Sequence, residues 1–177
     1  MENSGRVIYQ TQRLYTRLMT AEDLPIVRSI LQDPVVMKAY EHPFTEEEVR
    51  NWLDKQQASY KENGFGLWAV IVKETGEMIG QCGITWQEAV GKRVLEIGYL
   101  FLQAHWHRGY AAEAAMGAKE YAFQNLGASE VYSIIRSTNL AFMNVAIRNG
   151  MSIRGMMVKH YYGIDMPHYV FSVKKGK

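Results

Sequence analysis

Three successive strand-like segments that lead into one long alanine-rich segment constrain this fold more than any other feature of the sequence. The strand-like segments are rich in β-branched and aromatic side chains and cover residues 67–73, 78–86 and 93–102. Residues 109–126 contain no proline and precede Gly127, which is typical of a helix and its C-terminal stop. The sequence therefore predicts an antiparallel meander followed by a long helix.

The flanking segments extend this pattern into a mixed α/β arrangement. We expect helices over residues 24–33, 45–63 and 140–149, and a short helix over residues 35–40. We expect further strands over residues 13–19 and 131–136, and two more around residues 163–167. The expected order is β-α-α-β-β-β-α-β-α-β-β, a mostly antiparallel twisted sheet flanked by helices. Because the 177 residues contain no repeat and no linker, we expect one domain spanning residues 1–177.

Composition and charge exclude several classes of protein. Twenty basic and 18 acidic residues give a net charge of +2, too balanced for a protein that binds nucleic acid through a broad basic surface. The apolar stretches are far shorter than the roughly 20 residues of a membrane-spanning helix. Residues 1–10 lack the apolar core of a secretion signal, so a cytoplasmic protein is expected. The single cysteine, Cys82, fits a reducing compartment and is interpreted as a small buried strand residue.

The stretch from Leu102 to Ala115 joins the end of a predicted strand to the start of the alanine-rich helix. The first backbone amides of a helix have no intrahelical partner and carry the positive end of its dipole, so such a junction binds anions. Gly109 would let a phosphate approach the backbone, and His107 and Arg108 add side-chain donors. The alternative is an ordinary turn glycine beside two solvated basic residues. Neither standard glycine-rich nucleotide motif is present, so another phosphate ligand is expected.

Three motifs in the second half of the chain stand in a specific order and spacing. They are Glu96-Ile-Gly-Tyr, Trp106-His-Arg-Gly-Tyr-Ala-Ala-Glu-Ala and Asn139-Leu-Ala-Phe-Met-Asn-Val-Ala-Ile-Arg-Asn-Gly-Met. Together they resemble the GNAT superfamily of N-acetyltransferases. The resemblance is strongest to the RimJ/RimL-type branch, which includes ribosomal-protein N-terminal acetylases, and it covers nearly the whole chain.

The resemblance implies the GNAT acyl-CoA N-acyltransferase fold and acetyl-CoA as the acetyl donor. The donor's pyrophosphate would lie on the turn formed by His107, Arg108, Gly109, Tyr110, Ala111 and Ala112. Its pantetheine arm would pair like an added strand with the backbone of Tyr99, Leu100, Phe101 and Leu102. Asn139 matches the asparagine that holds this arm in the family, unless it only caps a helix. Asn144 also matches a frequent asparagine of this branch, unless it lies on an exposed helix face.

Four positions depart from the superfamily pattern. Phe142 replaces the serine three residues after the family's asparagine, and Ala146 replaces the tyrosine that usually acts as general acid. Trp106 occupies the first position of the R/Q-x-x-G-x-G/A signature, and His107 follows it where glycine is often found. Donor binding is compatible with these changes, but the general acid is left unassigned. A Cβ at His107 would crowd the loop modestly, while its imidazole could contact phosphate.

Glu96 is the candidate general base. Transfer of an acetyl group from a thioester to an amine requires a neutral amine and a stabilised tetrahedral oxyanion. Glu96 is the only acid in residues 93–102 and would accept the amine proton if burial raises its pKa toward neutrality. The alternative role is a structural carboxylate paired with Arg93 or Arg136. Backbone amides of residues 100–102 are the oxyanion candidates, and water can protonate the leaving thiolate.

The acceptor is the least determined part of this prediction. Residues 40–45 lie where the superfamily builds its acceptor groove, and the expected acceptor is a protein N-terminal amine or a small-molecule amine. A non-catalytic acyl-CoA-binding module is the alternative, because the usual serine and tyrosine are missing. The histidines show no metal-ligand spacing, so no metal is expected. No nucleic-acid or membrane partner is expected, and a homodimer is left open.

Overall fold

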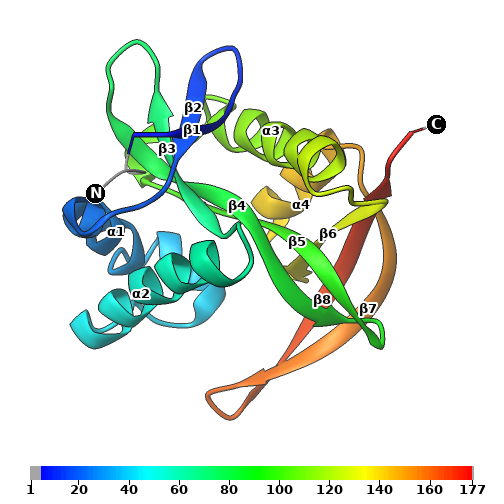
Figure 1. The fold of residues 1–177 in the computed structure, drawn as a ribbon. Coiled ribbons are helices and arrows are strands. Elements are labelled where there is room, and N and C mark those ends of the chain that lie inside the picture. Colours follow the sequence, from blue (N-terminus) through cyan, green and yellow to red (C-terminus); the bar gives the residue numbers. More distant parts are fainter. Residues whose placement is uncertain (1–4, 177) are drawn as a thin grey trace.

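The computed structural model describes residues 5–176, which form one eight-stranded sheet with helices on both faces (Figure 1). The strands are β1 (Val7–Gln10), β2 (Leu14–Arg17), β3 (Leu67–Val72), β4 (Met78–Ala89), β5 (Lys92–Phe101), β6 (Glu130–Arg136), β7 (Ser152–Tyr161) and β8 (Ile164–Lys174). The helices are α1 (Leu24–Leu31), α2 (Glu46–Glu62), α3 (Tyr110–Asn125) and α4 (Leu140–Arg148). Short 3-10 turns are η1 (Ala21–Asp23), η2 (Val36–Tyr40) and η3 (Gln103–His105).

The two faces of the sheet carry separate hydrophobic cores. Helices α1 and α2 pack on one face, and α3 and α4 pack on the other (Figure 1). On α3, the alanines Ala114, Ala118 and Ala122 are fully buried, so the helix backbone lies close to the sheet. These layers confirm the predicted mixed α/β fold.

The strand order in the sheet is β1-β2-β3-β4-β5-β6-β8-β7. Neighbouring strands run antiparallel except β5 and β6, which run parallel. β5 and β6 share one registered pair, Glu96 with Tyr132, and diverge beyond it. We call the opening between residues 98–101 of β5 and residues 134–136 of β6 the fork. The fork lies in the middle of the sheet, between the two hydrophobic cores.

The helices begin and end within two residues of the predicted positions. Thr45 Oγ1 accepts a hydrogen bond from the Glu48 amide at 3.2 Å, and the Glu48 carboxylate accepts one from the Thr45 amide at 2.7 Å. This capping box starts α2. The Asp33 carboxylate accepts from the Val35 amide at 2.8 Å at the start of η2, which is a 3-10 turn. Gly127, with a φ of 67°, follows the end of α3.

Two details of the first half differ from the prediction. The predicted order lacks β1, which is four residues long and pairs irregularly with β2. So short a strand carries too few residues to show a period-two pattern. β4 continues to Ala89, and the β4–β5 turn falls on Val90 and Gly91, whose φ angles are 47° and 75°.

Pro167 lies inside β8, opposite Val158, and not in a turn as predicted. The turn between β7 and β8 is formed by residues 162–163. The Pro167 carbonyl accepts from the Ser137 amide at 2.9 Å, beyond the last registered pair of β6 with β8. A proline is tolerated there because the ladder with β6 has ended, and no neighbour requires its missing N–H.

Candidate active site

The fork exposes backbone amides of β5 on the side that faces β6. Successive N–H groups of a strand alternate between its two neighbours. The Leu102 amide donates to the Ile79 carbonyl at 3.0 Å, so the amides of Leu102 and Leu100 point toward β4. The amides of Tyr99 and Phe101 therefore point into the fork. Of the predicted oxyanion donors, the amides of residues 100–102, only the Phe101 amide points into the fork. The Tyr99 amide, which is not predicted for this role, points into the fork as well.

Aromatic side chains form the end and one wall of the fork. Trp106 Nε1 donates to the Phe101 carbonyl at 3.0 Å. The Tyr99 hydroxyl donates to the Phe142 carbonyl at 3.2 Å, and the two ring centroids are 4.5 Å apart. Trp106 and Phe142 each contact both hydrophobic cores. Phe142 thus makes this wall apolar where a serine is usual, and the buried Ala146 supplies no hydroxyl.

The turn between β5 and α3 contains two residues in the left-handed region. His107 has a φ of 61° and Gly109 has a φ of 78°, and α3 begins at the next residue, Tyr110. This conformation strains a residue that carries a Cβ, although histidine adopts it more readily than most side chains. The turn therefore holds His107 in a strained backbone conformation. Tyr110 and Ala111 are half-buried and Ala112 is buried, and their amides belong to the unpaired first turn.

Arg13, just before β2, reaches the same turn. Its guanidinium donates to the Arg108 carbonyl at 3.0 Å and to the Glu113 carboxylate at 2.7 Å. It lies 4.5 Å from the centre of the Tyr110 ring, and its Nη2 is 3.4 Å from where a Cβ on Gly109 would be. Arg13 thus adds a guanidinium to the turn that contains Arg108. Sequence reasoning missed it because 95 residues separate the two arginines.

A groove of about 770 Å³ begins at this turn and follows α3. Arg13, Gly109 and Glu113 line one end, and Gln124 and Asn125 line the other. A ligand bound at the turn therefore has room to extend along the helix.

The two predicted asparagines lie on α4. The Asn139 side-chain oxygen accepts from the Phe142 amide at 3.2 Å, so Asn139 caps the helix. This hydrogen bond places Asn139 beside Phe142, which belongs to the aromatic wall of the fork. Asn144 is exposed, in agreement with the alternative interpretation that it lies on an exposed helix face and does not bind the donor.

Glu96 lies where β5 and β6 separate. Its Oε1 accepts from the Ile134 amide of β6 at 3.3 Å. Arg136 instead pairs with Glu41, and the Arg93 guanidinium lies 4.4 Å from the centre of the Trp86 ring. Within residues 5–176, the Glu96 carboxylate makes no salt bridge. Glu96 therefore does not form the ion pair with Arg93 or Arg136 that its alternative, structural role requires.

The environment of Glu96 brings its pKa close to neutrality. Burial raises the pKa of Glu96 to about 7, against the opposing effects of the Lys159 ammonium and the Ile134 amide. Tyr40 and Tyr99 also face this carboxylate, since its charge helps to raise the pKa of both phenols, after burial as the main cause. A carboxylate with this pKa exchanges protons readily at physiological pH.

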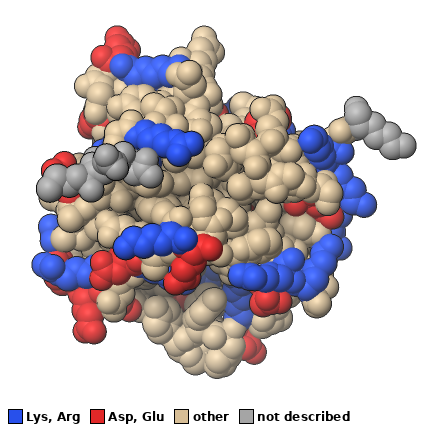
Figure 2. Space-filling view, viewed as in Figure 1, with Lys and Arg blue, Asp and Glu red and all other residues tan. Residues whose placement is uncertain are grey.

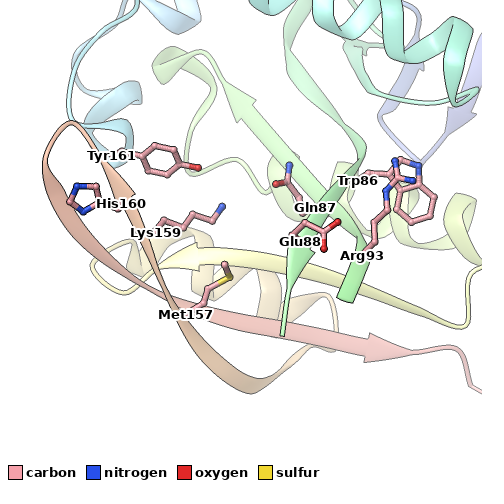
Figure 3. A pocket seen from close by; sticks show the side chains of 8 residues that line it. All are labelled: Trp86, Gln87, Glu88, Arg93, Met157, Lys159, His160 and Tyr161. Carbon is pink, nitrogen blue, oxygen red and sulfur yellow. The ribbon is translucent and has the colours of Figure 1, made fainter. Parts of the chain in front are cut away.

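Strand β7 and the β4–β5 hairpin enclose a hollow of about 500 Å³ (Figure 3). We call it the β7 hollow, and it is lined by Trp86, Gln87, Glu88, Arg93, Met157, Lys159, His160 and Tyr161. Gln87 is registered with Val94, two residues before Glu96, so Gln87 and Glu96 share one face of the sheet. The hollow therefore opens on the face where the Glu96 carboxylate lies.

The segment of residues 40–45, where an acceptor groove is expected, contacts the β7–β8 hairpin. Glu41 has a φ of 73°, and its carboxylate pairs with Arg136 at the end of β6. The His42 ring lies 4.4 Å from the Tyr162 ring at the tip of the hairpin. The tip, at the bottom of Figure 2, is largely uncharged. These contacts place the segment beside the β7 hollow.

Comparison with known proteins identifies the family. Residues 13–152 match the acetyltransferase (GNAT) domain family. The chain belongs to the GNAT acetyltransferase family. The uncharacterized protein YkkB of Bacillus subtilis strain 168 is 36% identical over 142 residues, which are 80% of this chain and 83% of YkkB.

Solved GNAT structures share the whole architecture. An acetyltransferase from Agrobacterium tumefaciens strain C58 has a TM-score of 0.80 and 26% identity, covering 99% of this chain and 98% of its own. The ribosomal α-N-protein acetyltransferase RimL has a TM-score of 0.81, covering 96% of this chain and 94% of its own. At 16% identity, the likeness to RimL shows the fold alone. The predicted GNAT fold is confirmed.

Cys82 lies in the core of this GNAT domain. Cys82 is buried in β4, and burial raises the pKa of its thiol to about 12, so it is a core residue as predicted. Across residues 5–176, no three His, Cys, Asp or Glu side chains form a group that could hold a metal ion. Among the described helices, none has the length and apolarity needed to cross a bilayer.

Proposed function

We propose that this chain transfers the acetyl group of acetyl-CoA to a primary amine, which attacks the thioester directly. The observation that carries the proposal is the position of Glu96. Its carboxylate, free of any described salt bridge and with a pKa of about 7, lies where two backbone amides point into the fork. Such a group can accept the proton of an amine held beside a thioester.

The donor would occupy the fork and the turn before α3. Its amide-bearing pantetheine arm can pair with the β5 edge at Phe101 as an added strand would, which leaves the Tyr99 amide for the thioester. The pyrophosphate can accept hydrogen bonds from the free amides at the start of α3, between the guanidinium groups of Arg13 and Arg108. Asn139, which caps α4 through its side-chain oxygen, keeps its amide nitrogen free to donate to the arm.

The proposed reaction uses groups that the fork brings together. The amine nitrogen bonds to the thioester carbon, and the resulting oxyanion accepts a hydrogen bond from the Tyr99 amide, the fork-facing amide nearer to Glu96. Glu96 accepts the proton that the nitrogen loses. The carbon–sulfur bond then breaks, and the thiolate takes up a proton from water. No tyrosine is required on α4, which explains how Ala146 is compatible with activity.

The acceptor class within this proposal is a protein N-terminal amine or a small-molecule amine. Residues 40–45 and the β7 hollow provide the acceptor side. A cytoplasmic location fits the proposal, since the free, buried Cys82 suits a reducing compartment.

The alternative is a non-catalytic acyl-CoA-binding module, which the residues at positions 142 and 146 would suit. Calorimetric titration with acetyl-CoA, followed by measurement of CoA thiol release across a panel of primary amines, separates the two. We expect binding together with amine-dependent thiol release. Binding without thiol release for every amine would favour the binding module, and absence of binding would contradict both.

A further inference from the structure

The walls of the β7 hollow differ in burial. The inner wall consists of half-buried residues: Gln87, Met157 and Lys159. The rim consists of exposed residues: Trp86, Glu88, Arg93, His160 and Tyr161. Figure 3 shows the Lys159 side chain of β7 extended into the hollow toward Gln87 and Glu88 of β4. Lys159 is therefore the charged group of the inner wall.

The other charges around the hollow lie on its rim or have partners of their own. Glu88 and Arg93 are registered partners on the rim, on the face of β4 and β5 opposite to Gln87 and Glu96, and the Arg93 guanidinium lies over the Trp86 ring. His160 contacts the Asp165 carboxylate at 2.7 Å, and Arg136, farther inside, pairs with Glu41.

Lys159 differs from these groups. Its ammonium makes no hydrogen bond or salt bridge to any described residue, and its charge acts on Glu96 at a distance beyond a direct contact. An ammonium on a half-buried side chain that has no partner is available to bind an anion.

We propose that the acceptor is a primary amine that also carries a carboxylate, and that Lys159 binds this carboxylate in the β7 hollow. The inference rests on the proposed function, because it assigns the substrate class of the same site. It excludes polyamines as preferred acceptors, since a second ammonium would face Lys159.

The reaction itself strengthens this interaction. Before proton transfer, the ionised Glu96 partly offsets the charge of Lys159. When Glu96 accepts the amine proton it becomes neutral, and Lys159 loses the attraction of that carboxylate. A substrate carboxylate then gains attraction as the reaction proceeds, so the benefit falls on turnover as well as on binding. Trp86 and Tyr161 on the rim offer flat apolar surface for the body of such a substrate.

Three amines with one skeleton test the charge preference. They are para-aminomethylbenzoate, para-aminomethylbenzamide and para-xylylenediamine, which present an anionic, a neutral and a cationic group opposite the reacting amine. We expect kcat/KM for the benzoate to exceed that for the benzamide about 10-fold or more, with the diamine lowest. Comparing ratios at one pH cancels any effect of Lys159 on the pKa of Glu96, which acts on all three amines alike.

Variants of Lys159 locate the preference. Lys159→Met should bring the benzoate-to-benzamide ratio close to one, Lys159→Arg should retain it, and Lys159→Glu should favour the diamine. Lys174→Met, which removes an exposed lysine from β8 outside the hollow, is the matched control and should leave the ratio unchanged. Thermal unfolding and acetyl-CoA titration of each variant confirm that the fold and the donor site are intact.

The outcomes distinguish this inference from the proposed function. Thiol release that is equal for the three amines, or highest for the diamine, overturns the substrate class but leaves the acetyltransferase proposal standing. A benzoate preference that survives in Lys159→Met overturns the role of Lys159. If neither these amines nor the wider panel releases CoA thiol, the proposed function fails, and the inference fails with it.

Discussion

At the scale of single residues, Glu96 shows how one carboxylate can serve function at the expense of stability. Burial is the largest influence on its pKa and outweighs Lys159 and the Ile134 amide, so the protonated form is favoured in the folded chain. A folded-state pKa above the unfolded value of 4.5 means that stability falls as the pH rises from 4.5 toward 7. The ionised base is therefore available only at a cost to folding.

Glu96→Gln should lower turnover by about 10²–10⁴-fold while leaving acetyl-CoA affinity unchanged, because the amide cannot accept the amine proton. Protonation of the acceptor amine by itself lowers kcat/KM as the pH falls. In the unmodified chain, kcat/KM should fall by about a further tenfold per pH unit below 7, as Glu96 becomes protonated. The variant should lose this further dependence and unfold at a higher temperature than the unmodified chain above pH 7. Steady-state thiol release and thermal unfolding over pH 5–9 provide both measurements.

The control is Glu74→Gln, which changes an exposed acid in the β3–β4 turn. Its rate and pH profile should match those of the unmodified chain. If Glu96→Gln retained the normal rate at every pH, Glu96 would be a structural residue.

At the scale of elements, the start of α3 concentrates backbone strain and positive charge in one turn. Two left-handed residues, His107 and Gly109, reverse the chain after β5 so that the first amides of α3 face outward. Arg13, supplied by another part of the sheet, lies over the same turn. Strain of this kind persists where surrounding contacts fix the backbone, and it is frequent at binding sites.

Two glutamate substitutions separate strain from ligand binding. Gly109→Glu and Gly64→Glu place a Cβ at nearly equal φ angles of 78° and 79°, and Gly64 has open space around it. Each should lower the free energy of unfolding by about 1–2 kcal/mol. Only Gly109→Glu should also weaken acetyl-CoA binding, by about 10-fold or more, because its carboxylate repels the phosphates. Equal calorimetric affinities for the two variants would contradict a donor site at this turn.

The elements that the sequence predicts well are those with a local signal. The capping box at Thr45, the glycine after α3 and the run of strand formers in β5 each act within a few residues. Position 96 was identified because it is the only acid on its strand.

The features that the sequence does not predict depend on contacts between residues that are distant in sequence. Arg13 meets α3 across 95 residues or more, and Lys159 approaches Glu96 from another hairpin. The direction of the Tyr99 and Phe101 amides depends on which neighbour each strand edge faces, and the sequence alone does not specify that pairing.

At the scale of the whole molecule, Glu113 links the first strands to the helix that carries the donor turn. Its carboxylate accepts hydrogen bonds from Thr11 Oγ1 at 2.6 Å and from the Arg13 amide at 2.7 Å, in addition to the Arg13 side chain. Partial burial raises the pKa of Glu113, but these hydrogen bonds outweigh it and hold the pKa below its usual value. The contribution of Glu113 to stability is therefore present above pH 4.5 and is lost as the pH falls through its folded-state pKa.

Glu113→Gln should lower the free energy of unfolding at pH 7 by about 1–3 kcal/mol, since it removes charged hydrogen-bond acceptors. The difference from the unmodified chain should shrink below pH 4, where the native carboxyl is also neutral. Urea unfolding at several pH values measures this difference. Glu120→Gln, an exposed position on the same helix, should show no such dependence, and a Glu113 deficit that stayed constant with pH would point to packing.

The single registered pair between β5 and β6 has a consequence for the exchange of backbone hydrogens with solvent. Along residues 99–102, alternate amides face β4 and the fork, so their hydrogens should exchange at alternating fast and slow rates in the ligand-free protein. Deuterium labelling followed by NMR should find Tyr99 and Phe101 fast and Leu100 and Leu102 slow. Saturation with acetyl-CoA should slow the first pair alone. The hydrogen-exchange rates of individual amides at the centre of this sheet would then report whether acetyl-CoA is bound.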